Sequence, residues 1–253
     1  MGRILDRYFQ RAALRRWQRM AQQAADAPHS LLRMQRDHAR GLRAHLDRVI
    51  HVADARLTLP LIGSRQFPKP VGTDWSWRPD LWRGPLSHPG VASAPRKAAL
   101  DPQVTVFHDC PHAENAFRQI RNRKSTDLAP YGLSIEVFSF EGSFLSVSVE
   151  LPIGMARDLT LQHMVQIGSL IVSDEPTHVY ARLNIRHGPN TEQVLRELAT
   201  SSEPVTMDFD LAHLHINERR IDKIWLDLIF ESPRMNRMVV RDLTFCRHHR
   251  ADL

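Results

Sequence analysis

The stretch HVYARLNIR, residues 178–186, decides the fold class of this chain. Its positions 179, 181, 183 and 185 are apolar, and the positions between them are polar or charged. Because successive side chains of a strand point to opposite faces, this alternation predicts a strand with one buried and one polar face. The polar face would carry His178, Tyr180, Arg182, Asn184 and Arg186.

Similar segments follow one another through residues 104–253, separated by turn signals such as Glu141-Gly142 and Gly188-Pro189-Asn190. Short strands at this spacing predict an antiparallel sandwich or barrel that folds without the rest of the chain. Two helices are expected inside this domain, at 113–122 and 191–198. The expected strands are 104–107, 133–140, 144–151, 165–172, 178–186, 205–211, 223–230 and 238–246.

The first 56 residues have a different character and predict a basic helical arm. They contain twelve arginines and five aspartates, a net charge of +7, whereas residues 57–253 have a net charge of −1. Apolar residues recur at helical spacing over 3–25 and 31–53, and Pro28 separates the two runs. We therefore expect two helices joined by a turn.

The first helix carries two stripes at four-residue spacing, one apolar and one basic. An amphipathic helix of this kind either lies on an anionic membrane surface or docks its apolar face on a protein partner, and both hypotheses remain open. Nucleic acid is not the expected partner, because arginine outnumbers lysine thirty to four over the whole chain and reflects a general compositional bias. The anionic-surface residues would be Arg3, Arg7, Arg11 and Arg15.

Residues 57–103 predict an extended segment rich in tryptophan and proline. Leu57 to Ile62 reads as a short strand, and seven prolines follow it between residues 68 and 102. Proline at this density disfavours helices and central strands. Trp75, Trp77 and Trp82 predict that the segment is pinned to a surface by its rings; the alternative is a flexible linker.

Several classes of protein are excluded or disfavoured by absent features. The chain has no apolar run of about 18 residues, and arginines interrupt the region where a signal peptide would have its apolar core. Two cysteines are too few for a disulfide framework. No phosphate-loop, dinucleotide or zinc-protease motif is present. We expect a cytoplasmic protein, peripheral to the membrane if the arm binds lipid, with no cofactor and no metal.

The outward side chains of the predicted strands form the candidate ligand-binding surface. Guanidinium, carboxylate and amide groups bind hydroxyls, and an indole stacks on the apolar face of a pyranose ring. The alternative is a solvated sheet crossed by ion pairs, each worth about 0.2–1 kcal/mol. The candidate residues are Tyr180, Arg182, Asn184, Arg186, Asp208, Asp210, Trp225 and Asp227.

Catalytic and metal-binding alternatives depend on fewer residues. A glycoside-acting enzyme would use carboxylates among Glu150, Asp208 and Asp227 as acid and base. Cys110-x-His112 and Cys246-x-His248 would form a zinc site only if two strands brought them together. His108, Asp109 and Cys110 have the residue types of a nucleophile with its base, without a surrounding oxyanion hole. No catalytic residue is predicted.

Several motifs resemble an uncharacterised bacterial family of unknown function: WSWRP (75–79), RLNIRHGPN (182–190), FDLA (209–212), WLDLIFESP (225–233) and VRDLTF (240–245). The last strand pair, with Trp225 followed by VRDLTF, is also similar to the closing strands of jelly-roll carbohydrate-binding modules. The acidic calcium-binding loops of those modules are not recognisable here.

The resemblance implies a mainly β, jelly-roll-like antiparallel sandwich that carries the N-terminal helical arm. We expect a non-catalytic ligand-binding protein, with carbohydrate as the candidate ligand. A structural protein that assembles through the arm is the first alternative, and the glycoside-acting enzyme is the second.

Overall fold

The computed structural model describes the backbone of residues 2–62, 67–112, 114–124 and 126–250, and most side chains outside 2–8, 10 and 50–62. Two compact units divide the chain, residues 1–52 and 53–253. Helix α1 spans Gly2–Gln23, a 3-10 turn follows at Ala24–Asp26, and helix α2 spans His29–Ile62. None of the described helices combines the length and apolarity needed to cross a bilayer.

The helices confirm the helical arm but correct one boundary. Residues 57–62, which the sequence predicts as a strand, continue helix α2. Three leucines at alternate positions are too short a pattern to distinguish a strand from a helix. Pro60 lies near the end of α2, and the helix ends two residues later.

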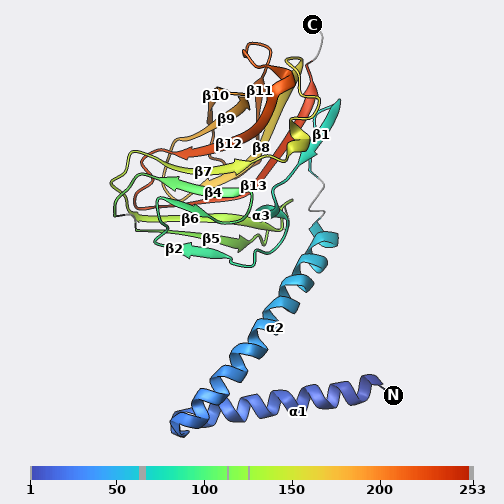
Figure 1. Cartoon of the computed structure of the whole chain (residues 1–253), viewed down its shortest axis with the longest axis vertical. Helices are drawn as coiled ribbons and strands as arrows, with labels where there is room; N and C mark the ends of the chain where they lie inside the picture. Colours follow the sequence, from blue (N-terminus) through green and yellow to red (C-terminus); the bar gives the residue numbers. More distant parts are fainter. Residues whose placement is uncertain (1, 63–66, 113, 125, 251–253) are drawn as a thin grey trace. The chain divides into compact units, whose positions relative to one another are not determined.

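The strands confirm the predicted jelly-roll-like antiparallel sandwich (Figure 1). In the described residues, one sheet has seven strands in the order β11-β8-β13-β6-β5-β2, with β1 also paired to β13. The other has six in the order β10-β9-β12-β7-β4-β3. The bounds are β1 Thr73–Trp77, β2 Gly90–Ala92, β3 Lys97–Ala99, β4 Val104–His108, β5 Glu114–Arg121, β6 Tyr131–Ser139, β7 Leu145–Glu150, β8 His163–Ser173, β9 Val179–His187, β10 Asn190–Leu198, β11 Val205–Asp210, β12 Ile221–Phe230 and β13 Asn236–His249.

Two of these strands were predicted as helices. Residues 113–122 contain good helix formers, yet β5 pairs with β6 and β2 and buries Asn115 and Phe117. Residues 191–198 form β10, the edge strand that pairs with β9 along its whole length. In both segments sheet pairing overrides local helix propensity. The charged residues of β10 suit an edge strand, where charge discourages pairing with other chains.

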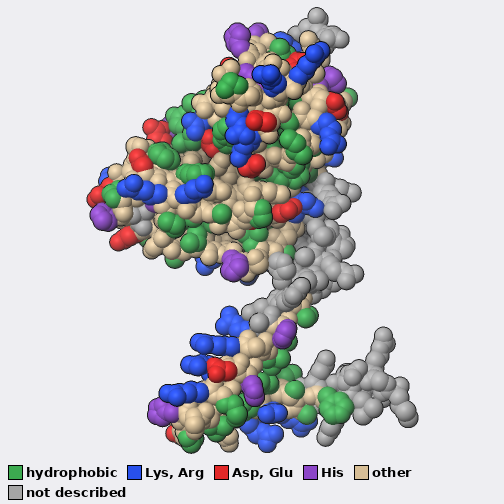
Figure 2. Space-filling model, in the orientation of Figure 1, with side chains coloured by type: hydrophobic (Ala, Val, Ile, Leu, Met, Phe, Trp, Pro, Cys, Tyr) green, Lys and Arg blue, Asp and Glu red, His purple; other side chains and the backbone are tan. Residues whose placement is uncertain are grey.

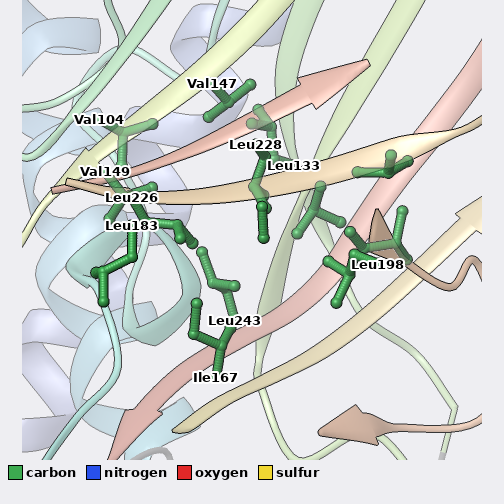
Figure 3. Close-up of a cluster of buried hydrophobic side chains, with 14 of the residues drawn as sticks. Val104, Leu133, Val147, Val149, Ile167, Leu183, Leu198, Leu226, Leu228 and Leu243 are labelled. Atoms are coloured by element: carbon green, nitrogen blue, oxygen red, sulfur yellow. The ribbon is translucent and has the colours of Figure 1, made fainter. Parts of the chain in front are cut away.

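The core lies between the sheets and is built by the predicted apolar alternation. Leu145, Val147 and Val149 of β7 have no exposed surface, and neither do Leu226 and Leu228 of β12. Figure 3 shows such side chains converging from strands of both sheets. The last two strands occupy central positions, β12 between β9 and β7, and β13 between β8 and β6.

The tryptophan-rich segment is part of the sandwich. It supplies β1, β2 and β3, and a single-turn helix, α3 (Asp80–Arg83), places Leu81 and Trp82 in the core at 0% exposure. Trp82 Nε1 donates to the carbonyl oxygen of Val240 at 2.9 Å. Arg78, also buried, donates from Nε and Nη2 to the two carboxylate oxygens of Asp242 at 2.8 Å each.

Candidate functional site

The strand register of the six-stranded sheet brings several predicted residues together. Residue Asp227 of β12 lies opposite Arg182 of β9 on one side and Ser148 of β7 on the other, and Ser148 lies opposite Thr105 of β4. Directly opposed residues of antiparallel strands share a face. The next row across the same face contains Asn184, Trp225 and Glu150.

A groove of about 540 Å³ lies over these rows. We call it the sheet groove. Its lining includes aromatic, hydroxyl and charged side chains, among them Thr105, Phe107, Ser148, Arg182, Trp225 and Asp227. Trp225 and Phe107 are half-buried, and Phe144 at the rim is 40% exposed. The groove therefore offers ring faces next to hydrogen-bonding groups, the mixture that is usual in small-molecule sites.

Asp227 is the most strongly held charged group in the sheet groove. Its side chain is 8% exposed, and Oδ2 accepts hydrogen bonds from Arg182 Nε (3.2 Å), Arg182 Nη2 (2.9 Å) and Asn184 Nδ2 (3.0 Å). All three bonds go to Oδ2. Carboxylate oxygens have about four lone-pair sites in total, so Oδ1 keeps the capacity to accept from a ligand.

Asn184 lies beneath the surface of the sheet groove and positions Asp227, but it does not line the groove itself. Its side chain has no exposed surface, and besides Asp227 its Nδ2 donates to the carbonyl oxygens of Arg182 and Trp225. These bonds from Nδ2 fix the position of the groove carboxylate, whereas the buried Asn184 Oδ1 has no hydrogen-bond partner among the described residues. Arg186 lies two residues further along β9 on the same face and lines the groove. Its Nε donates to Asp222 Oδ1 at 2.9 Å, and that hydrogen bond raises the pKa of Arg186.

Trp225 lies beside a second ion pair. Lys223 Nζ is 2.6 Å from Glu150 Oε2 and 5.7 Å from the centre of the Trp225 ring. Lys97 Nζ is likewise 5.7 Å from the centre of the Phe107 ring. Cations at this distance from a ring face are attracted by its quadrupole. These contacts hold the rings while leaving them partly accessible.

Besides Asn184, three predicted residues do not line the sheet groove. Tyr180 shares the outer face, where its hydroxyl donates to Glu231 at 3.4 Å, but it does not line the groove; burial and Glu231 raise its pKa. Asp208 and Asp210 belong to β11, an edge strand of the other sheet. Asp208 accepts from Gln166, and Asp210 accepts from the backbone of Ala212. The expectation that they share a face with Trp225 is therefore wrong.

Asp208 and Asp227 lie on different sheets, so they do not form the carboxylate pair of the enzyme hypothesis. The two remaining carboxylates of the enzyme hypothesis, Glu150 and Asp227, are each engaged by a cation.

The residues His108, Asp109 and Cys110 have structural roles. Asp109 accepts from the backbone and hydroxyl of Ser143 and from the Phe144 backbone, and these bonds lower its pKa to about 2. His108 Nε2 lies 3.0 Å from the Ala94 carbonyl oxygen, and Cys110 Sγ accepts from the Glu141 backbone. No nucleophile is set against a base in this group.

The second cysteine is also unsuited to chemistry. Cys246 lies on β13, in the centre of the seven-stranded sheet, whereas Cys110 follows β4 of the other sheet. Burial raises the pKa of Cys246 to about 11, which leaves the thiol protonated and unreactive at neutral pH. The paired Cys-x-His zinc site is not formed among the described residues.

Sequence reasoning missed the side of the sheet groove formed by β3, β4 and the segment before β7. The outward orientation of Phe107 could have been predicted, because Thr105 and Phe107 alternate with the apolar residues Val104 and Val106. Lys97 and Phe144 carried no periodic signal, since they lie on a three-residue strand and just before a strand.

Comparisons with solved structures find matches of low similarity. A tailspike protein domain of bacteriophage CBA120 has 6% identity and a TM-score of 0.41; the match covers 56% of this chain and 19% of that one. A family 11 carbohydrate-binding module from Clostridium thermocellum has 9% identity and a TM-score of 0.39 over 63% of this chain and 96% of the module. A family 22 module from the same organism has 7% identity and a TM-score of 0.38, covering 74% and 99%.

A search of curated proteins finds no match. The sequence comparison that does succeed covers every residue of the chain. Residues 1–253 match the family of unknown function DUF6478, and the chain belongs to that family.

Proposed function

We propose that the sheet groove binds a carbohydrate without catalysis. The observation that carries the proposal is the position of Trp225, a half-buried ring that lines the groove opposite Asn184 and one row from the Arg182–Asp227 pair. A pyranose presents an apolar face that packs on an indole and hydroxyls that both donate and accept. Arg182 supplies donors, and Asp227 Oδ1 supplies an acceptor.

The charge balance of the sheet groove favours an uncharged ligand. Arg182 is paired with Asp227, Arg186 with Asp222, and Lys223 with Glu150. A site for a phosphate or carboxylate would keep cations available for the ligand. Here three of the four lining cations are paired with carboxylates and the fourth, Lys97, lies over the Phe107 ring, so a polyhydroxylated neutral molecule fits better than an anion.

The proposal predicts that Trp225→Ala abolishes glycan binding while the protein stays folded. The change removes the stacking surface and leaves Leu226 and Leu228 packed, so the free energy of unfolding should fall by less than about 1 kcal/mol. A glycan array with the full-length protein identifies the bound glycan, and calorimetry with that glycan compares the variants.

The matched control is Asp208→Asn, a change on the other sheet that should leave glycan binding unaltered. Two results would contradict the proposal: a wild-type protein that binds none of the arrayed glycans, or a Trp225→Ala variant that binds as tightly as the wild type.

We further propose that the helical arm binds an anionic lipid surface. In its described part, exposed apolar side chains accompany exposed arginines, as Figure 2 shows. Phe9 is 65% exposed and Leu14 is 61% exposed, and Arg11 and Arg15 lie on the same helix; the side chains of Arg3 and Arg7 lie outside the described residues. Apolar insertion and charge attraction act together at a membrane surface.

This proposal predicts charge-dependent flotation with anionic liposomes. Basic residues contribute about 1 kcal/mol each near an anionic surface, so changing Arg3, Arg7, Arg11 and Arg15 to Gln should abolish flotation, and added salt should weaken it in the wild type. Flotation that is equal in the variant, or absent in the wild type, would reject lipid binding. Concentration-dependent self-association of the non-floating protein would then favour assembly through the arm.

A further inference from the structure

A cluster of potential metal ligands lies away from the sheet groove, where three strands of the seven-stranded sheet end. Asp74 of β1, His163 of β8 and His249 of β13 each offer one ligand atom, and these atoms lie within 4.8 Å of one another. Among the described residues this is the only such group of three. It belongs neither to the proposed glycan site nor to the arm.

Strand pairing places the three residues together. His163 and His249 are directly opposed at the β8–β13 ladder. Asp74 sits at an irregularity of the β1–β13 ladder, where Thr73 pairs with His248 and Trp75 with Arg247. A bulged residue is turned out of the regular register, and bulges often re-aim a side chain toward a site.

His163 is held so that one ring nitrogen faces the carboxylate. The residue is 3% exposed, its Nδ1 accepts a hydrogen bond from the Thr160 backbone N–H at 3.1 Å, and Nδ1 lies 2.9 Å from Thr160 Oγ1. Its Nε2 lies 3.5 Å from Asp74 Oδ2 and has no hydrogen-bond partner among the described residues. This nitrogen is a buried polar atom without a protein partner, which calls for an explanation such as a missing ion.

The other two ligands are accessible from solvent. Asp74 is oriented by Arg247, which donates from Nε to Oδ1 at 3.0 Å and to Oδ2 at 3.1 Å, and from Nη2 to Oδ2 at 2.7 Å. These bonds leave one acceptor site on the carboxylate, because its oxygens have about four. His249 is exposed, with its ring centre 4.2 Å from that of His163. An exposed side chain can rotate to complete a site.

We propose that Asp74, His163 and His249 bind a divalent transition-metal ion, with water in the remaining position. Two imidazoles and one carboxylate suit zinc or a neighbouring transition metal better than calcium or magnesium. The separation of 3.5 Å between His163 Nε2 and Asp74 Oδ2 is long for a hydrogen bond. It is close to the edge of roughly 3.3 Å that a tetrahedron has when its metal bonds are about 2.0–2.1 Å.

The competing arrangement is a hydrogen bond from a neutral His163 to the Asp74 carboxylate, without metal. In that case Nδ1 of His163 accepts from the Thr160 backbone, and Nε2 carries the proton that faces Asp74. Metal binding requires the other tautomer, in which Nδ1–H donates to Thr160 Oγ1 in place of the bond from the Thr160 backbone, and Nε2 is free to bind the ion. A metal-bound histidine usually donates its other ring N–H to a hydrogen-bond acceptor in this way.

The test is a titration of chelator-treated, tag-free full-length protein with zinc, followed by calorimetry, and with cobalt(II), followed by its visible absorption. The wild type should bind one ion, with a cobalt spectrum typical of a four- or five-coordinate site. His249→Ala should lose that ion, and because His249 is exposed the variant should remain folded. The control is His178→Ala, an exposed histidine that contacts Glu197 on the other sheet and should leave binding unchanged.

A wild-type protein that binds neither ion at the cluster would overturn the inference. Equal binding by wild type and His249→Ala would also overturn it, since the ion would then lie elsewhere. Failure of this test leaves the glycan-binding proposal unaffected, because the two sites share no residue.

Discussion

A fragment comprising residues 104–253 should fail to unfold cooperatively, although the strand pattern of the sequence predicts that this part folds by itself. The fragment lacks β1, β2 and β3 and the buried pair Leu81 and Trp82 of α3. It therefore loses an edge strand from both sheets and a large part of the core next to β13. Residues 53–253, the compact unit, should show a single sharp thermal transition in circular dichroism.

The loss of Arg78 adds an electrostatic penalty to the shorter fragment. Burial raises the pKa of Asp242, and the Arg78 guanidinium, whose side chain has no exposed surface, opposes that effect by binding both carboxylate oxygens. Removing one partner of a buried pair typically costs about 3–5 kcal/mol. A sharp transition in 104–253 at a temperature close to that of 53–253 would show that the tryptophan-rich segment is dispensable.

The Trp82→Ala variant should be destabilised by about 3–5 kcal/mol, the usual cost of truncating a buried aromatic side chain. Trp82 has no exposed surface, and its loss also leaves the Val240 carbonyl oxygen without the indole donor. Chemical denaturation of the full-length protein, followed by circular dichroism, measures the change in the free energy of unfolding.

The matched comparison is Trp225→Ala, where the same chemical change on the sheet surface should cost less than about 1 kcal/mol. Trp82→Phe should fall between the two, because it keeps most of the ring and loses the hydrogen bond. Equal destabilisation by the two alanine variants would show either that Trp82 is not part of the packing or that Trp225 is.

The sequence by itself predicts those features that depend on neighbouring residues along one strand. The alternation in β7, β9 and β12 correctly predicts the apolar side chains that form the core, because a strand has a two-residue period whatever it pairs with. It does not predict that Asn184 and Asp227 of the outer face are buried as well. The same reasoning places Arg182, Trp225 and Asp227 on the outer face, and it makes Phe107 outward as well.

Features that depend on pairing partners could not be predicted in this way. Residues 113–122 and 191–198 have the composition of helices, and only pairing with β6 and β9 makes strands of β5 and β10. Alternation tells on which side of its own sheet a residue lies, but not which sheet contains the strand. This is why Asp208 was grouped with Trp225 although the two lie on different sheets.

The sequence alone therefore determined the sandwich class, the helical arm and the inner and outer faces of most strands, because these follow from local periodicity and charge. Only the tertiary structure decided which outer residues form the sheet groove, how Trp82 and Arg78 complete the core, and that Asp74 meets His163 and His249. These residues are far apart along the chain, 89 positions in the case of Asp74 and His163. Their meeting depends on strand order and register, which no single segment encodes.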